Sequence, residues 1–497
     1  MPRRNLHYLM FVMVVSFVCY LKADSVHRDH YRGMFDTFQE AMTKIRGRYL
    51  YEISERELFE GAMTGMVSKL DQYSAYHGET ETRKFREDID QEFGGVGIEV
   101  AWDAKTGSLA VLSPIVGSPA YEAGIMAGDR IVEINGNSTA EMTLNDAVSR
   151  LKGKPDEMVR ITVERPGLEK PLVLNLKRAV INVNSVLGDV RRPDGSWEFT
   201  LASDPTIGYI RITQFGKKTI DELKVALEKC KQENIRGLIL DLRNNPGGLL
   251  DAARDVCDLF VKEGVIVTIR DRNRNERERH EATGAAPYTD WPMAVIVNHH
   301  SASAAEIVSA CLQDHARAIV VGQRTWGKGT VQSPFELEDG RSMLRLTIAS
   351  YWRPSGRNIH RAETDKETDP WGVSPDAGYE VKLDDAQTAA LESQRRSRDV
   401  VHRPGEAVSA AAKPQAAATP TASAPTATGK STESSKPDAK PDADKTEQKP
   451  DAKPSGDEKS TTAPTENEAE KPKGPIIDEA LQKAIEYIRQ KSTTAKA

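Results

Sequence analysis

The chain has 497 residues, of which 38% are hydrophobic and 29% are charged, and its formal net charge at pH 7 is -6. That length allows two or three domains, and the charge balance lacks the basic surplus typical of nucleic-acid-binding proteins. The four cysteines are scattered, without the spacing of a disulfide framework or a metal site. We therefore expect no nucleic acid as partner and no metal.

The N-terminus carries Arg3 and Arg4, followed by an apolar run from Tyr8 to Leu21. This run fits the core of a signal peptide better than a full membrane span, which needs about 20 residues. No clear cleavage site follows it, so 1–24 is interpreted as either a signal peptide or a membrane anchor. Both alternatives predict a location in the cell envelope, periplasmic or exported, and the second adds anchoring to the inner membrane.

Residues 25–89 are predicted to form an N-terminal helical region. Apolar side chains recur there at steps of three and four residues, as on one face of a helix; they are Phe35, Phe38, Met42 and Ile45. A second helix is expected over about Leu58–Leu70.

Residues 90–179 change to short strands separated by glycine turns. The strand candidates are rich in branched apolar residues; they are Val96–Ala101, Leu109–Leu112, Arg130–Ile134 and Val159–Val163. Short helices are expected to begin near Pro119 and Leu144.

Strands and amphipathic helices alternate over 180–390. The expected strands are Ile207–Ile212, Leu238–Leu242 and Ala294–Val297, and the expected helices are Thr219–Gln232, Leu249–Phe260 and Ala304–Leu312. Such alternation predicts an α/β layer with helices packed on a sheet.

Residues 391–475 become rich in Ala, Pro, Lys and Asp, and the tetrapeptide Lys-Pro-Asp-Ala repeats. Such a segment buries too little apolar area to offset its ordering entropy, so we predict a disordered, solvated linker. A helix is expected again within 476–497, where Ile477, Leu481, Ala484, Ile485 and Ile488 form one apolar face. We predict that this helix packs on the core; a free interaction helix is the alternative.

Ser303 stands in a segment, 297–307, whose pattern indicates a strand, a short turn and the start of a helix. Free backbone amides gather at a helix start, so a nucleophile there would gain an oxyanion site from its neighbour. The same residues, Ser303 to Glu306, also fit a capping box, in which Ser303 would be only a structural cap.

Lys328 lies in the segment 321–330, which nearly matches the phosphate loop G-x-x-x-x-G-K-[ST]. Gly329 stands where the metal-binding hydroxyl should be, and a strand pattern follows instead of a helix, so nucleotide binding is disfavoured.

We favour Lys328 as a general base. Lysine normally titrates near ~10.4 and must be desolvated to act as a base at neutral pH, and Trp326 with the glycine backbones could bury it. On a strand Lys328 and Gln332 would share one face, so Gln332 could aim the amine. A solvated surface lysine is the alternative.

A buried strand pattern over 237–242 ends in a glycine turn that contains Gly247 and Gly248. Glycine lets backbone amides point outward, which suits a second oxyanion donor; an ordinary strand-to-helix turn is the alternative. Asp241 and Arg243 are expected to lock the turn by pairing with each other.

The region from Phe93 to Gly136 resembles a PDZ domain. Gly95, Val96, Gly97 and Ile98 match the loop whose amides hold a terminal carboxylate, and Gly128-Asp129 and Asn135-Gly136 match the turn signature. Such domains bind a C-terminus by strand addition.

The order of motifs resembles the C-terminal processing (tail-specific) serine peptidases, over about residues 35 to 380 and the final helix. The motifs are the PDZ module, the segment from Asp241 to Gly248, Ser301-Ala-Ser303-Ala, and Gly327-Lys328-Gly329-Thr330. The resemblance implies an α/β core similar to the crotonase and Clp-protease fold, in a multi-domain α+β chain with an inserted PDZ domain.

This resemblance also implies site roles. Ser303 is the nucleophile, Lys328 the base and Gln332 its orienting residue, and the oxyanion donors are the amides of Ala304 and of Gly247 or Gly248. The expected partners are protein substrates with free C-termini, and no cofactor is expected. An adaptor protein and a homodimer stay open.

Two alternatives remain. A Ser–His–Asp hydrolase would recruit His299, His300, His315 or His360, although no G-x-S-x-G elbow surrounds these serines. A PDZ scaffold with an inactive protease-like core would be expected to lack Ser303 or Lys328, and both are present.

Overall fold

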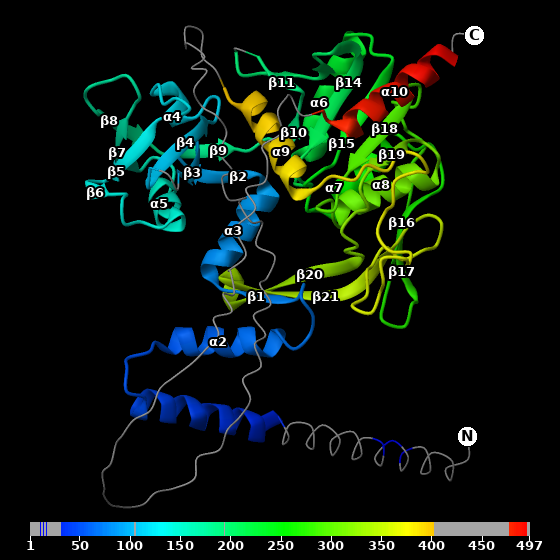
Figure 1. Ribbon diagram of the computed structural model, residues 1–497. Coiled ribbons are helices and arrows are strands. Elements are labelled where there is room, and N and C mark those ends of the chain that lie inside the picture. The colour runs from blue at the N-terminus through cyan, green and yellow to red at the C-terminus, as the bar shows by residue number, and fades with distance from the viewer. Residues whose placement is uncertain are drawn as a thin grey trace, which may run out of the picture. The chain divides into compact units, whose positions relative to one another are not determined.

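The computed structural model describes residues 31–103, 106–192, 194–401 and 477–494, together with isolated positions near the N-terminus (Figure 1). It divides into two units, and the first combines the chain up to Arg86 with Val331–Ile348. The second unit contains Glu87–Thr330 and the chain from Ala349 onward. Most of the predicted leader 1–24 and of the predicted linker lies outside the described residues. Within the described ranges, no helix combines the length and the apolar character that crossing a bilayer requires.

The first unit is built from N-terminal helices and a strand pair. A helix covers 31–48, and α2 spans Glu55–Val67. α2 begins three residues before the expected helix because Ser54 and Glu57 form a capping box there. β1 (Ala75–His77) pairs antiparallel with the first half of β21 (Ser342–Trp352), which also pairs with β20 (Thr330–Leu337).

The apolar face predicted for the first helix is open to solvent in the described chain. Phe35, Phe38 and Ile45 are exposed by 69%, 43% and 39%. The periodicity therefore predicted the helix correctly but did not identify what would cover it.

A two-stranded stalk joins the PDZ-like region to the rest of the second unit. The stalk pairs β2 (Glu92–Gly95) with β9 (Ala179–Asn182), which are the strands that enter and leave the region; α3 (Glu79–Asp90) precedes it. The sheet beyond it has the order β3-β4-β5-β7-β8. These strands are Ile98–Asp103, Ser108–Pro114, Arg130–Ile134, Met158–Glu164 and Leu172–Lys177, with β6 (Asn137–Ser138) on β5.

The core of this region consists of branched aliphatic side chains from alternate strand positions. Ile131, Ile134 and Ile161 are fully buried beneath α4 (Pro119–Glu122) and α5 (Leu144–Leu151). Within the described chain β3 lies at the edge of the sheet and pairs only with β4.

A mixed sheet with the order β10-β14-β15-β18-β19 forms the centre of the second unit. Its strands are Val186–Leu187, Asp204–Ile212, Gly237–Asp241, Met293–Val297 and Ile319–Gly322, and the last four run parallel. β13 (Thr200–Leu201) also pairs with β14, while β11 (Val190–Arg191) and β12 (Trp197–Glu198) pair with each other. β16 (Val265–Arg270) and β17 (Glu276–Glu281) form a hairpin in a separate sheet, where β16 also pairs with the end of β21.

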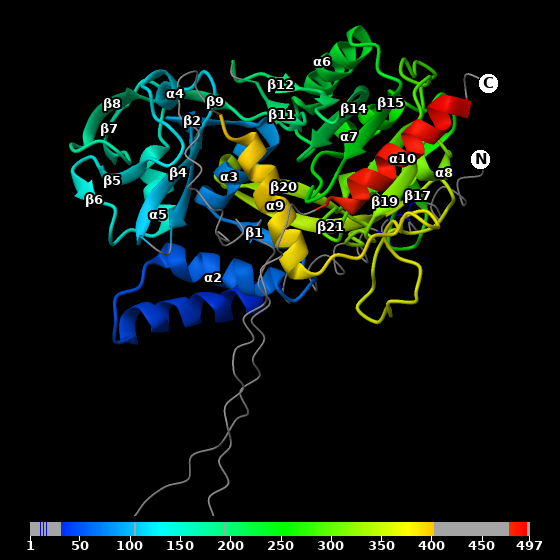
Figure 2. The same cartoon turned by 45° about the horizontal axis from the view of Figure 1, so that its top comes forward.

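Helices pack on this sheet, as the alternating pattern predicted. α6 (Thr219–Gln232), α7 (Leu250–Asp258) and α8 (Ala304–Asp314) connect successive strands. α10 (Glu479–Thr494) lies along β15, β18 and β19 (Figure 2). A Cβ on Gly237 would lie only 2.2 Å from Ile488 Cγ2, so glycine in β15 allows α10 to approach closely.

The C-terminal helix therefore docks on the core, which confirms the favoured prediction over a free helix. Its buried side chains are Ala480, Ala484 and Ile488, with Leu481 and Ile485 partly buried. Ile477 was placed on this face by the sequence, but it precedes the helix and is 59% exposed.

The predicted linker start at 391 is wrong. α9 (Asp385–Asp399) continues to Asp399, so 391–399 is helical. Its capping box at Asp384 and Gln387 gives a local signal, but α9 lacks buried residues and is held by ion pairs. Arg395 and Arg398 pair with the buried carboxylate of Asp189, and Asp399 pairs with Arg211 at 2.7 Å.

Candidate active site

Ser303 lies where a buried strand ends and a buried helix begins. β18 ends at Val297 and α8 begins at Ala304, which confirms the predicted strand, turn and helix. Ser303 is 5% exposed, with φ 56° and ψ −114°. A positive φ costs a residue with a Cβ about 1–2 kcal/mol, and such strain concentrates at functional sites. The surrounding structure must therefore stabilise Ser303 in this strained conformation.

The loop that contains Asn244 and Asn245 is fastened to the Ser303 turn. The Asn244 amide donates to Asn298 Oδ1 at 2.9 Å, and Asn298 Nδ2 donates back to Asn244 Oδ1 at 2.7 Å. The Ala302 amide donates to Asn245 O at 2.9 Å. These bonds fix the two predicted halves of the oxyanion site against each other.

Gly247 lies directly against Ser303. A Cβ on Gly247 would lie 2.7 Å from Ser303 Cβ and 3.0 Å from Ala304 N, so a side chain there would displace Ser303. The Gly247 amide donates to Asn245 Oδ1 at 2.8 Å, within its own loop. The structure therefore brings Ser303, Ala304 and Gly247 together, and Gly248 follows as the next amide along the loop.

Glu306 is a fully buried carboxylate that the sequence identified only as part of a capping box. Its Oε2 accepts the amides of Ser303 and Lys328, each at 2.8 Å. Its Oε1 accepts the Gly327 amide at 2.7 Å and the Thr325 hydroxyl at 2.5 Å. Burial raises the pKa of Glu306 to about 7, and these hydrogen bonds oppose the rise.

Lys328 lies in an irregular turn rather than on a strand, because β20 begins only at Thr330. The expectation that Lys328 and Gln332 share a strand face is therefore wrong. Lys328 is half-buried, whereas Trp326, predicted to cover the amine, is 42% exposed. The flanking glycines are buried, and a Cβ on Gly329 would lie 2.2 Å from the His360 amide nitrogen.

Gln332 belongs to the first unit, four positions beyond Lys328 in the chain. Its side-chain amide donates to Thr347 Oγ1 at 3.1 Å, within the same unit. Its role as the residue that orients Lys328 stays a prediction.

Tyr351 is a site residue that sequence reasoning missed. Its side chain hydrogen-bonds with Ser303, and its amide donates to Gly329 O at 2.7 Å. Burial raises the pKa of Tyr351 to about 12, although the bond with Ser303 acts in the opposite direction. No local motif marks this tyrosine, since it lies in β21, far along the chain from Ser303.

Asp241 and Arg243 pair as predicted. Arg243 Nη2 lies 2.6 Å from Asp241 Oδ2, which also accepts the Tyr209 hydroxyl at 2.6 Å. Burial alone would raise the pKa of Asp241, but the neighbouring Arg243 guanidinium lowers it. Arg243 also pairs with Asp478 at 2.9 Å and so connects the glycine loop to the start of α10.

The residues of the predicted carboxylate loop lie between β2 and the edge strand β3. Gly97 has φ 76°, and a Cβ there would lie 2.2 Å from Ser118 Cβ, so only glycine fits without displacement. Its carbonyl accepts the Ser118 hydroxyl at 3.0 Å and the Ile115 amide at 2.9 Å. Val96 is 2% exposed, and Ile98 is partly buried in the module's core.

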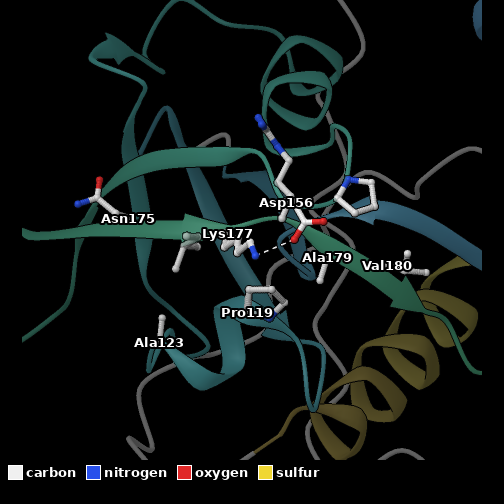
Figure 3. A pocket seen from close by; sticks show the side chains of 10 residues that line it. Pro119, Ala123, Asp156, Asn175, Lys177, Ala179 and Val180 are labelled. Atoms are coloured by element: carbon white, nitrogen blue, oxygen red, sulfur yellow. Dashed lines mark ion pairs between the residues drawn. The ribbon is translucent and has the colours of Figure 1, made fainter.

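A surface hollow of about 550 Å³ lies elsewhere on the PDZ-like module (Figure 3). Pro119, Asn175 and Val180 line it, and Lys177 pairs with Asp156 across it at 2.7 Å. None of its lining residues belongs to the Ser303 turn or the carboxylate loop.

Two of the four histidines proposed for a Ser–His–Asp triad, His315 and His299, bond with groups other than Ser303. His315 follows the last residue of α8, about 18 Å along the helix from Ser303 at 1.5 Å per residue, and its Nε2 bonds with Val265 O at 2.7 Å. His299 Nδ1 lies 3.3 Å from Gln323 Oε1. Neither geometry favours a histidine base.

Three family models match this chain. Residues 206–378 match peptidase family S41, and residues 111–165 match a PDZ domain. Residues 20–82 match the N-terminal domain of the activating protease CtpB.

Individual proteins are similar over most of the chain. A carboxy-terminal-processing protease of Bartonella bacilliformis is 36% identical over 350 residues, which cover 70% of this chain and 75% of that protein. The carboxy-terminal processing protease CtpA of Bacillus subtilis is 34% identical over 328 residues, covering 66% and 67%. Among solved structures, a photosystem II D1 C-terminal processing protease is 28% identical, with a TM-score of 0.39 over 69% of this chain and 86% of that one.

Proposed function

This chain belongs to the carboxy-terminal processing proteases of peptidase family S41 and is a serine endopeptidase with a PDZ domain, and we propose that Ser303 and Lys328 carry its chemistry. Ser303 Oγ attacks the carbonyl carbon of the scissile peptide bond, and Lys328 Nζ accepts the hydroxyl proton. Lys328 then returns the proton to the leaving amine. Water hydrolyses the acyl-enzyme in the reverse sequence, with Lys328 again as base.

The oxyanion that forms during attack would be held by backbone amides. The Ala304 amide lies at the start of α8, and the glycine loop lies against Ser303. Because the Gly247 amide already donates to Asn245 Oδ1, the Gly248 amide is the better second donor in this conformation. The Gly247 amide would serve only after the loop rotates and this hydrogen bond breaks. Donors of this kind contribute about 10²–10³-fold to kcat each.

The observation that carries this assignment is the carboxylate of Glu306. It binds the main chain of Ser303 and of Lys328 through one oxygen, although the two residues belong to different turns. Such a buried connection holds two distant segments in a fixed relationship. A fixed nucleophile and base are what a Ser–Lys dyad requires.

The PDZ module supplies the preference for protein C-termini in this proposal. The edge of β3 that pairs with no other described strand would accept the substrate tail as an added strand, and the amides of the loop from Gly95 to Ile98 would hold its terminal carboxylate. Protein substrates with free C-termini follow from this arrangement, and Gln332 would aim the Lys328 amine.

The test is cleavage of an unstructured protein with a free C-terminus, with the cut sites mapped by mass spectrometry. Ser303→Ala and Lys328→Ala should each abolish cleavage, while His299→Gln and His300→Gln should retain it. Amidation of the substrate C-terminus should slow cleavage by wild type. Full activity of Lys328→Ala would overturn the dyad, and loss of activity in a histidine variant would favour the triad.

We also propose that the N-terminal segment places the protein in the cell envelope, either as a cleaved signal or as an anchor to the inner membrane. Fractionation of cells that express the full chain, with N-terminal sequencing of the product, separates these outcomes. Size-exclusion chromatography with light scattering tests the homodimer, and co-purification tests an adaptor.

A further inference from the structure

Gln91 occupies an unusual position between α3 and β2. It is 1% exposed and has φ 55°. Positive φ is usually taken by Gly, Asn or Asp, and a buried side-chain amide must be hydrogen-bonded to avoid a desolvation cost. Its neighbours Asp90 and Glu92 instead form ion pairs with Lys217 and Lys218. The side chain of Gln91 is therefore held inward by the fold.

The buried amide of Gln91 joins three segments of the second unit. Its Oε1 accepts the Lys218 amide at 2.7 Å, and its Nε2 donates to Val183 O at 3.3 Å. Its main-chain carbonyl accepts the Val183 amide at 2.9 Å. Gln91 thus connects the start of β2 and the residue after β9 to the loop 213–218.

Gln91 fills the space above Gly216. A Cβ on Gly216 would lie 2.5 Å from both Cγ and Oε1 of Gln91. The residue before it, Phe215, is 1% exposed and pairs through its main chain with the glycine loop. Its amide donates to Gly247 O at 2.9 Å, and its carbonyl accepts the Leu249 amide at 2.7 Å. The position of Phe215 therefore sets the position of Gly247 and Gly248.

We propose that Gln91 is a positioning residue for the oxyanion site, acting through Gly216 and Phe215 on the main chain of Gly247 and Gly248. The chain of contacts is continuous, from the Gln91 amide through the main chain of 215–218 to the glycine loop. This inference rests on the proposed function for the meaning of the glycine loop. The contacts themselves stand without it.

The consequence is an effect on turnover rather than on substrate binding. Without the Gln91 hydrogen bonds, the loop 213–218 loses its support, and the glycine loop relaxes from its place beside Ser303. A displacement of about 1 Å at an active site lowers the rate by up to about 10²-fold. The edge of β3 is not part of this contact chain, so tail binding is unaffected.

The experiment compares three Gln91 variants. Gln91→Met keeps the volume and removes the side-chain hydrogen bonds with Lys218, Val183 and Thr219. Gln91→Glu keeps the acceptor for the Lys218 amide, and Gln91→Ala also opens a cavity. Gln91→Met should lower kcat by about tenfold to hundredfold with KM within twofold, and Gln91→Glu should recover a large part of that loss. Gln214→Ala is the matched control. Gln214 lies in the same loop, 213–218, and its side-chain amide donates to Asp88 O at 3.2 Å.

Hydrogen exchange supplies a readout that needs no substrate. In Gln91→Met the amides of Phe215 and Leu249 should exchange at least tenfold faster than in wild type, while the Leu238 amide, which donates to Pro292 O, should not change. Unchanged exchange at Phe215 and Leu249, or wild-type kcat in Gln91→Met, overturns the proposal. If Ser303→Ala retains cleavage, the proposed function fails, and exchange still decides the role of Gln91.

Discussion

The main-chain amides of Ser303 and Lys328 donate to the same atom, Glu306 Oε2, at 2.8 Å each. The other carboxylate oxygen accepts Thr325 and Gly327, so four donors converge on one fully buried group. All four partners are donors, so their hydrogen bonds favour the charged carboxylate, but burial outweighs them and raises the pKa of Glu306. The turn that contains Ser303 and the turn that contains Lys328 are in this way held together by a side chain of α8.

Replacement of Glu306 by Gln should lower kcat by about ten- to hundredfold. A Gln side chain presents an NH2 group to one pair of donors, so two donors lose their acceptor and the two turns shift. Steady-state kinetics on an unstructured protein measure this change. Glu486→Gln, at an exposed position of α10, is the matched control, and wild-type turnover in Glu306→Gln would show that the shared carboxylate is dispensable.

The pH dependence of stability should report the titration of Glu306. Its folded pKa of about 7 lies above the usual glutamate pKa of 4.5, so its contribution to the free energy of unfolding is full below about pH 4.5 and is lost as pH rises to about 7. The shift corresponds to about 3 kcal/mol at most. Urea unfolding of wild type and Glu306→Gln from pH 4 to 8 should show their difference shrink over this window. A difference that stays constant with pH would contradict the raised pKa.

Removal of the Tyr351 hydroxyl should affect catalysis more than folding. Tyr351→Phe keeps the buried ring and removes the hydrogen bond with Ser303, so we expect kcat to fall several-fold with KM unchanged and stability reduced by about 1 kcal/mol. Kinetics and thermal unfolding measure both effects. The control is Tyr288→Phe, which removes a hydroxyl that bonds Glu228 at 2.6 Å in another part of the core; it should leave kcat unchanged. Equal kinetics of the two variants would remove Tyr351 from the site.

The C-terminal helix should contribute to stability through packing rather than through its surface charges. Ile488→Ala should cost about 2–5 kcal/mol because Ile488 is 1% exposed against the sheet. Arg489→Ala breaks the ion pair between Arg489 and Asp204, whose charged groups lie 2.8 Å apart. Because the Arg489 side chain is 59% exposed, this loss should cost less than about 1 kcal/mol.

Gly237 gives a second test of the same contact. Gly237→Ala should destabilise the protein because its Cβ would meet Ile488 at 2.2 Å, and adding Ile488→Ala should recover part of the loss. Denaturant unfolding of the single and double variants measures the coupling. Additive effects would mean that the helix can shift away from β15.

Local pattern alone located several elements and the site motifs. The strand Arg130–Ile134 and the helix Thr219–Gln232 were predicted at their observed bounds, because apolar periodicity records which face of an element is buried. Ser303 was placed at a strand-to-helix turn for the same reason. The order of motifs also gave the family, since each motif is short and contiguous in the chain.

Tertiary structure alone decided how these motifs meet. A capping box predicts the contact of Glu306 with Ser303, but its contacts with Thr325 and Lys328 come from a turn beyond the next strand. Likewise α9 is held by Arg395 and Arg398 against Asp189, so its sequence carries little apolar pattern. Hydrophobic periodicity is a local record of burial, whereas hydrogen bonds and ion pairs between distant segments depend on the folded path of the chain, which no local window contains.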